Sequence, residues 1–217
     1  MNCSALWAGE AGKAPATPAA TGPGDAPRLL VVGDSLSAEY GLTRGSGWVA
    51  LLEQRLAKAG LRYQVVNASI SGDTTSGGRS RLPALLKRHT PAVVVIELGG
   101  NDALRGLPLT SSRDNLMQMT QAAQTAGAKV LLLGMQVPPN YGPQYTRDFA
   151  TMFSDVAKAR KAPLLPFLLK GFADGADAER WFQPDRIHPK AEAHPLILDN
   201  VWPLLQPLLV AGAKPAR

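Results

Sequence analysis

The chain has 217 residues, of which 45% are hydrophobic and 18% charged, a composition typical of a globular protein. Its apolar runs stay well below the roughly 18 residues of a membrane-spanning helix, so we expect no stable membrane insertion. The net charge of +6 comes from scattered Lys and Arg rather than from a basic block, which argues against nucleic-acid binding. Cys3 is the only cysteine, so the chain forms no internal disulfide.

Residues 1–27 are rich in Ala, Pro, Gly and Thr and show no hydrophobic periodicity. This composition predicts a disordered leader, and residues 211–217 are expected to form a flexible tail. The leader lacks an apolar stretch of the length that a signal peptide needs. We therefore expect a periplasmic or secreted protein whose signal was already removed, or else a cytoplasmic protein.

From Arg28 onward, apolar runs of strand length alternate with segments of helical length. The expected strands are 28–33, 63–68, 92–98, 129–135 and 163–167. Helices are expected near 46–59, 76–89, 111–126 and 146–160, with a last helix from about Pro195 that Pro203 and Pro207 should shorten or bend. This alternation predicts one α/β domain over residues 28–210, with a parallel sheet between two layers of helices.

Polar clusters follow the first three expected strands. They are Gly-Asp-Ser at 33–35, Ser-Gly-Asp at 71–73 and Gly-Gly-Asn-Asp at 99–102. Right-handed crossovers bring the carboxyl ends of parallel strands to one edge of the sheet, where α/β proteins bind ligands. Ser35 is therefore a candidate nucleophile. A fourth cluster, at 185–189, holds Asp185 and His188 before the last helix.

These residue types suit nucleophilic catalysis. A serine hydroxyl becomes a useful nucleophile when a neutral imidazole accepts its proton, and a carboxylate on the other ring nitrogen holds the imidazole in place. His188 and Asp185 are candidates for these two parts. Attack on a carbonyl creates an oxyanion, which the N–H groups of Ser35 and Gly72 and the amide of Asn101 could bind.

Each of these residues also has a structural interpretation. Asp34 and Ser35 could cap a helix, Gly72 could form a turn, and Asn101 could cap the segment that follows it. A single histidine such as His188 is more often structural than catalytic. We assign no role to His89 or His194, and the scattered histidines predict no metal site.

Taken together, the four clusters resemble the conserved blocks of the SGNH (GDSL) hydrolases, in the same order and at matching spacing. The similarity extends over about residues 28–209 and is closest to the bacterial thioesterase I/protease I/lysophospholipase L1 group and related arylesterases. Further matching segments are N-A-S-I-S-G-D-T at 67–74, E-L-G-G-N-D-A-L-R-G at 97–106 and P-x-N-Y-G at 138–142.

The resemblance implies a flavodoxin-like three-layer sandwich with a five-stranded parallel sheet. It implies a catalytic triad of Ser35, Asp185 and His188, an oxyanion hole from Ser35, Gly72 and Asn101, and no cofactor. It further implies a mobile lid at 102–108 and substrate contacts from Asp34, Leu36, Asp102, Leu104 and Val137. Two residues depart from the family pattern near the site: Glu39 replaces a small residue, and Arg186, which could compete for Asp185, replaces a common glycine.

We therefore expect a serine esterase or thioesterase that acts on small-molecule acyl or aryl esters and thioesters, as a monomer or weak dimer. Lysophospholipase activity follows only from the resemblance. One alternative is a carbohydrate O-deacetylase of the same family, although aromatic residues for a sugar groove are only 6% of the chain. A second is a non-catalytic nucleotide- or flavin-binding module, although the sequence contains no G-x-G-x-x-G or P-loop motif.

Overall fold

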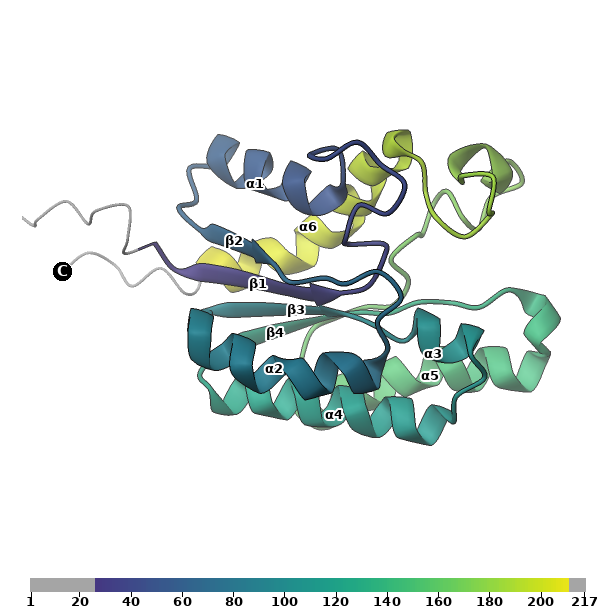
Figure 1. The fold of residues 1–217 in the computed structure, drawn as a ribbon, viewed down its shortest axis with the longest axis horizontal. Helices are drawn as coiled ribbons and strands as arrows, with labels where there is room; N and C mark the ends of the chain where they lie inside the picture. Colours follow the sequence, from purple (N-terminus) through teal and green to yellow (C-terminus); the bar gives the residue numbers. More distant parts are fainter. Residues whose placement is uncertain (1–25, 211–217) are drawn as a thin grey trace, which may run out of the picture.

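The computed structural model describes residues 26–210, and a five-stranded parallel sheet forms its centre (Figure 1). The strand order is β2-β1-β3-β4-β5, with every neighbouring pair parallel. The strands are β1 (Arg28–Gly33), β2 (Gln64–Asn67), β3 (Val93–Glu97), β4 (Lys129–Leu133) and β5 (Leu164–Leu165). All five predicted strands are present, most of them shorter than the sequence indicated.

Helices cover both faces of the sheet and complete a three-layer sandwich (Figure 1). One face carries α1 (Trp48–Lys58) and α6 (His194–Val210), and the other carries α2 (Thr75–His89), α4 (Leu109–Thr125) and α5 (Pro143–Arg160). The structure also contains a short helix, α3 (Gly100–Leu104), and three single-turn helices that were not predicted, Pro139–Tyr141, Ala178–Trp181 and Ala191–Ala193. The predicted fold class is confirmed.

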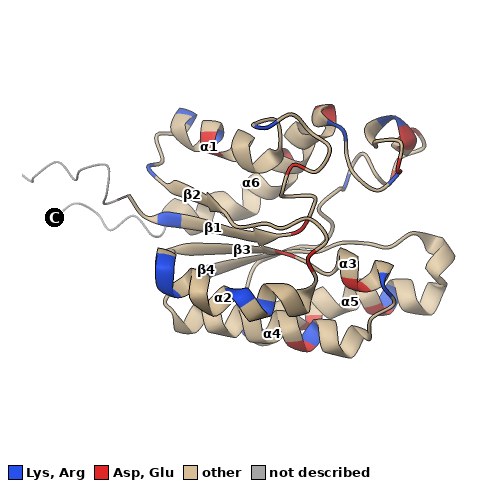
Figure 2. Ribbon diagram, viewed as in Figure 1, with Lys and Arg blue, Asp and Glu red and all other residues tan. Residues whose placement is uncertain are grey.

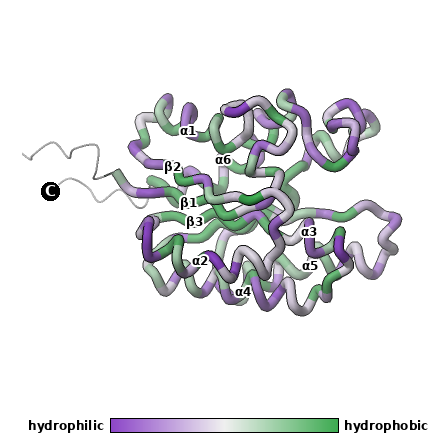
Figure 3. Tube along the Cα trace, in the orientation of Figure 1, coloured by the Kyte–Doolittle hydropathy of each residue, from purple (hydrophilic) through white to green (hydrophobic). Residues whose placement is uncertain are grey.

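The core lies in two layers because successive side chains of a strand point to opposite faces. Leu29 and Val31 pack into the cluster under α1 and α6, whereas Leu30 and Val32 pack into the cluster under α2, α4 and α5. All four are fully buried, and each such burial stabilises the fold by about 1.5–3 kcal/mol. Figure 3 shows the hydrophobic strands between helices whose outer sides are hydrophilic.

Helix α6 corrects one prediction, because it runs unbroken for 17 residues through Pro203 and Pro207. Both prolines lie on its exposed side, while Ile197, Val201 and Leu205 are fully buried on the other. The free energy gained by burying that apolar face exceeds the cost of the two missing N–H donors. Carbonyl groups near the end of the helix accept hydrogen bonds from Tyr63 and Lys129.

The predicted domain at 28–210 falls within the described residues. The leader predicted for 1–27 lies almost entirely outside the described residues, as does the tail predicted for 211–217. Within 26–210, no helix combines the length and apolar character needed to cross a bilayer.

Candidate active site

Three side chains from distant parts of the sequence form a hydrogen-bonded chain at the carboxyl edge of the sheet. The Nε2 atom of His188 lies 2.8 Å from Oγ of Ser35, and its Nδ1 atom lies 2.7 Å from Oδ2 of Asp185. Ser35 follows β1, whereas Asp185 and His188 belong to the loop between β5 and α6. The structure thus brings together the hydroxyl, imidazole and carboxylate that the sequence singled out.

The loop at 185–188 holds the carboxylate against the imidazole. Oδ1 of Asp185 accepts the backbone N–H groups of Ile187 and His188 at 2.9 and 3.0 Å. Partial burial opposes ionisation of Asp185, but its hydrogen bonds with His188 and Ile187 outweigh burial and lower its pKa from 3.8 to about 2. Asp185 is therefore ionised at neutral pH and keeps its second oxygen for the imidazole.

The two residues that depart from the family pattern both have left-handed backbone angles. Arg186 has φ +59°, and its exposed guanidinium lies 3.7 Å from Glu179 rather than on the carboxylate of Asp185. A glycine adopts this backbone conformation without strain, which accounts for the residue common in relatives. Glu39 also has φ +59°, and its carboxylate accepts the N–H groups of Gly45 and Gly47. Neither side chain interrupts the contact between Asp185 and His188.

Asp34 ties the serine turn to the third polar cluster. Its Oδ1 atom accepts the N–H of Leu36 at 3.1 Å, so a hydrogen bond joins the residues before and after Ser35. Its Oδ2 atom accepts the side-chain amide of Asn101 at 3.0 Å. Burial raises the pKa of Asp34, against the effect of these two hydrogen bonds. Asp34 thus fixes the position of the Asn101 amide relative to Ser35.

Gly72 lies in a turn after β2 with φ +79°, a conformation that favours glycine. Its carbonyl oxygen accepts the guanidinium of Arg105 at 2.7 Å, and the following Asp73 pairs with Arg81 at 2.8 Å. These contacts hold the orientation of the Gly72 peptide. Within residues 26–210, the backbone N–H groups of Ser35 and Gly72 donate no hydrogen bond, so both are available to donate one to a ligand.

The side chains predicted to contact substrate have different surroundings. Leu104 in α3 is 54% exposed, Val137 after β4 is half-buried, and Leu36 is buried in the core. Asp102 is also buried, and its carboxylate accepts hydrogen bonds from Thr75 and Ser112, so it binds protein groups rather than solvent.

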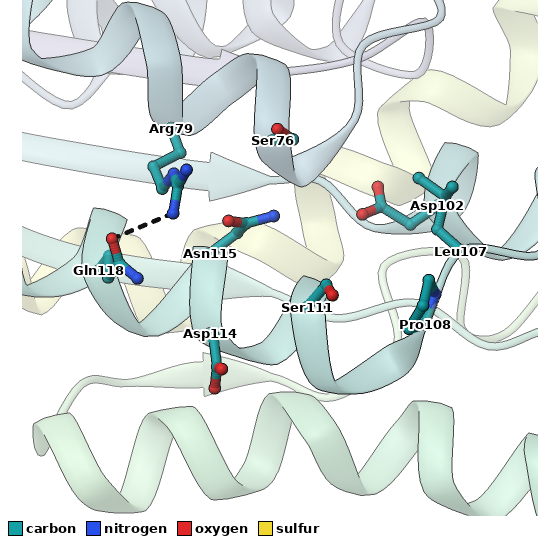
Figure 4. Close-up of a pocket in the computed structure, with 9 residues that line it drawn as sticks. All are labelled: Ser76, Arg79, Asp102, Leu107, Pro108, Ser111, Asp114, Asn115 and Gln118. Atoms are coloured by element: carbon teal, nitrogen blue, oxygen red, sulfur yellow. Dashed lines mark hydrogen bonds between the residues drawn. The ribbon is translucent and has the colours of Figure 1, made fainter.

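A cavity of about 450 Å³ lies beside Asp102, between α2 and α4 (Figure 4). Its lining is mostly polar and includes Arg79, which donates to Gln118 at 3.2 Å. Neither Ser35 nor His188 lines it, so this cavity is separate from the hydrogen-bonded chain.

Two neighbours of the site were missed by the sequence analysis. The ring of Tyr40 lies 4.3 Å, centroid to centroid, from the imidazole of His188. Glu97 ends β3 and is fully buried directly beside the Ser35 turn. Nothing in the sequence marks Tyr40, but Glu97 is a lone acidic residue after four apolar ones, which is a readable signal for a buried carboxyl group.

Acidic residues gather at the carboxyl ends of β1 and β3, in the middle of the fold (Figure 2). Lys and Arg are spread over several elements in the same view. Residues 26–210 contain no group of three or more His, Cys, Asp or Glu side chains arranged to hold a metal ion.

Comparison with known proteins identifies the family. The profile of the GDSL-like lipase/acylhydrolase family matches residues 31–196. Esterase TesA of Pseudomonas aeruginosa is 55% identical over 181 residues, which cover 83% of this chain and 89% of that protein. Thioesterase 1/protease 1/lysophospholipase L1 of Escherichia coli is 42% identical over 181 residues, covering 83% and 84%.

A solved structure supports the same assignment. The crystal structure of TesA superposes with a TM-score of 0.80 at 55% identity, and the match covers 84% of this chain and 99% of that one. The resemblance found in the four polar clusters is thereby confirmed. The chain belongs to the GDSL-like lipase/acylhydrolase family, the SGNH hydrolases, and is a carboxylic ester hydrolase of that family.

Proposed function

We propose that the chain hydrolyses acyl esters and thioesters through an acyl-enzyme formed on Ser35. His188 accepts the proton of the hydroxyl during attack and returns it to the leaving alcohol or thiol. Asp185 holds the imidazole and stabilises its charged form. Water activated by His188 then releases the acid. The observation that carries this proposal is the unbroken chain of contacts, 2.7 Å from Asp185 to His188 and 2.8 Å from His188 to Ser35.

The oxyanion of the tetrahedral intermediate would be bound by three N–H donors. Those of Ser35 and Gly72 donate no bond within the described residues. The amide of Asn101 has two hydrogens, one of which goes to Asp34. The other is available to the oxyanion. Donors held in place before the reaction stabilise the developing charge without reorganisation.

Exposed apolar side chains support an apolar substrate. One large exposed hydrophobic residue lies in the segment after each of the five strands: Tyr40, Ile70, Leu104, Tyr141 and Ile187. These segments follow the carboxyl ends of the parallel strands, so they lie on the same side of the sheet as Ser35. We infer that they receive short- to medium-chain acyl or aryl groups, with Val137 lining the acyl pocket. One relative has lysophospholipase L1 in its name, and lysophospholipids are acyl esters that the same mechanism could hydrolyse.

Covalent labelling with a phosphonate ester tests whether Ser35 is the nucleophile. The p-nitrophenyl ester of an alkyl phosphonate should release p-nitrophenol once per chain and add one phosphonyl group to Ser35. Mass spectrometry of the digested protein locates the adduct. An adduct on another residue, or retained activity after complete labelling, would overturn the assignment.

Hydrolysis rates decide between the proposed activity and its alternative. Aryl and acyl-CoA esters should react faster than acetylated xylan, whereas the opposite order would favour a carbohydrate O-deacetylase. The periplasmic or secreted location and the monomeric or weakly dimeric state stay predictions from the sequence.

A further inference from the structure

The carboxyl group of Glu97 lies directly behind the serine turn. Its Oε2 atom accepts the backbone N–H of Asp34 at 3.2 Å and the hydroxyl of Ser37 at 2.8 Å. Ser37 in turn accepts the indole N–H of Trp48 at 3.2 Å. Glu97 is fully buried, and its Oε1 atom has no hydrogen-bond partner. A buried carboxyl group with one oxygen unpaired calls for a physical explanation.

The first glycine of the Gly-Asp-Ser cluster makes room for this carboxyl group. Gly33 pairs with Glu97 across β1 and β3. A Cβ atom on Gly33 would lie 2.7 Å from Oε2 of Glu97 and 2.8 Å from Oγ of Ser37, closer than such contacts occur. The serine turn and Glu97 are therefore packed as one unit.

Asp34 and Glu97 form a pair of buried carboxyl groups. Burial and the nearby charge of Asp34 raise the pKa of Glu97 well above 4.5, and burial raises that of Asp34. Two further titratable groups face the pair: Arg81, which donates to the Gly33 carbonyl, and His188, whose protonated form lowers the pKa of Asp34.

Two adjacent buried carboxyl groups hold a proton to higher pH than isolated ones because their like charges repel. Asp34 accepts two hydrogen bonds that favour its ionised form, from Leu36 and Asn101. Glu97 has an unpaired oxygen, so the neutral form is favoured there. The proton therefore belongs on Glu97, which leaves a single negative charge on Asp34.

We propose that Glu97 is a positioning residue for the hydrolysis. As a neutral acid it holds the Asp34 backbone and leaves the Asp34 carboxylate free to orient the Asn101 amide and the turn that carries Ser35. This inference rests on the roles proposed above for Ser35 and Asn101. Within the described residues, Glu97 itself makes no hydrogen bond to the Ser35 hydroxyl or to any of the three proposed oxyanion donors.

Two variants separate its charge from its contacts. Glu97→Gln keeps a carbonyl acceptor of the same shape without a charge, and should retain kcat within about threefold of the wild type. Glu97→Leu removes the acceptor and should lower kcat by about 10- to 100-fold, with KM changed less than about threefold, because misplaced donors weaken the transition state. Val156→Ala, a core substitution in α5, controls for a general loss of stability.

The pH profile of kcat gives a readout that packing alone does not move. When the wild-type pair loses its last proton at alkaline pH, a second buried charge should disturb the turn and lower kcat. Glu97→Gln should lack this alkaline decline, while Arg81 and His188 are unchanged in both proteins. The Gln variant also keeps the test valid if the Leu variant fails to fold.

The outcomes are distinguishable from those of the proposed function. Retained activity in Ser35→Ala would refute the function itself. If Ser35→Ala is inactive, the inference about Glu97 fails in either of two cases. One is that Glu97→Gln loses as much kcat as Glu97→Leu, and the other is that it keeps the wild-type alkaline profile.

Discussion

The imidazole of His188 lies 2.8 Å from the hydroxyl oxygen of Ser35, although 153 residues separate the two in the sequence. Parallel strands explain this proximity, because each crossover returns the chain to the same edge of the sheet. The carboxylate of Asp185 lies 2.7 Å from Nδ1 of the imidazole, and the ring of Tyr40 packs against it with the centroids 4.3 Å apart. The fold itself thus provides the geometry needed for proton transfer.

Ser35→Ala is expected to lower kcat on p-nitrophenyl butyrate by about 10⁴-fold or more, because among residues 26–210 only the Ser35 hydroxyl is hydrogen-bonded to Nε2 of His188. The fold should persist, since the substitution removes a single oxygen from a half-buried side chain. Steady-state kinetics and circular dichroism measure both. Ser80→Ala, at an exposed position of α2, is the control and should be unchanged. Activity within tenfold of the wild type would exclude Ser35 as the nucleophile.

Asp185→Asn should reduce kcat by about 10³- to 10⁴-fold, because an amide no longer holds the Nδ1–H tautomer and stabilises no imidazolium. The lowered pKa of Asp185, about 2, keeps the wild-type carboxylate ionised throughout the assay range. The loss is therefore expected across the whole assay range rather than at one end of the profile. Asp155→Asn, exposed on α5, serves as the control. An effect limited to acid pH would contradict this role.

Asn101→Ala should lower kcat by about 10²- to 10³-fold with little change in KM, the usual effect of losing one oxyanion donor. Its amide lies 3.0 Å from the Asp34 carboxylate, so the substitution also removes a partner of that group. Rates for a series of p-nitrophenyl esters should fall in parallel, because the oxyanion is common to all of them. A change confined to KM would instead point to a role in binding the acyl chain. Gln121→Ala on the surface of α4 is the matched control.

Much of this site can be predicted from the sequence, for a physical reason. Buried strands of a parallel sheet are continuous apolar runs, so β1 and β3 stand out, and the polar residues directly after them are forced to one edge. Helix α3 was missed because five residues are too few to show a helical period. The length of α6 was wrong because packing of its buried face outweighs the local effect of Pro203 and Pro207. The contact of Glu97 with Asp34 depends on strand register, which no local pattern reveals.

Gly33→Ala tests the packing of the serine turn. The added Cβ would approach Glu97 at 2.7 Å and Ser37 at 2.8 Å, so the turn must shift. We expect a loss of about 1–3 kcal/mol in the free energy of unfolding, typical of overpacking, together with lower kcat. Urea denaturation measures the first quantity. Gly175→Ala is the control, because nothing lies within 4 Å of the added atom there, and its stability should stay near the wild-type value.

His194 acts as the cap of a helix distant in sequence. Its Nδ1 atom accepts the backbone N–H of Trp48 at 3.0 Å, at the start of α1, where Gly47 has no side chain to do so. His194 is 2% exposed, and burial lowers its pKa to about 4, against the attraction of Glu39 and a hydrogen bond at Pro189. An acceptor on Nδ1 requires the neutral imidazole, which the lowered pKa favours.

The free energy of unfolding should therefore fall as the pH drops from 6.5 to about 4. Over this range the unfolded chain binds a proton at His194 and the folded chain does not, which favours unfolding by about 3 kcal/mol at the acid end. His194→Asn keeps an acceptor near Trp48 but does not titrate, so its urea midpoint should depend less on pH over the same interval. His89→Gln, at the end of α2, removes a histidine whose pKa burial and the neighbouring Arg88 and Arg28 also lower, so it should flatten the slope, but less than His194→Asn does. Identical slopes for the wild type and His194→Asn would show that His194 is protonated equally in the folded and unfolded chain.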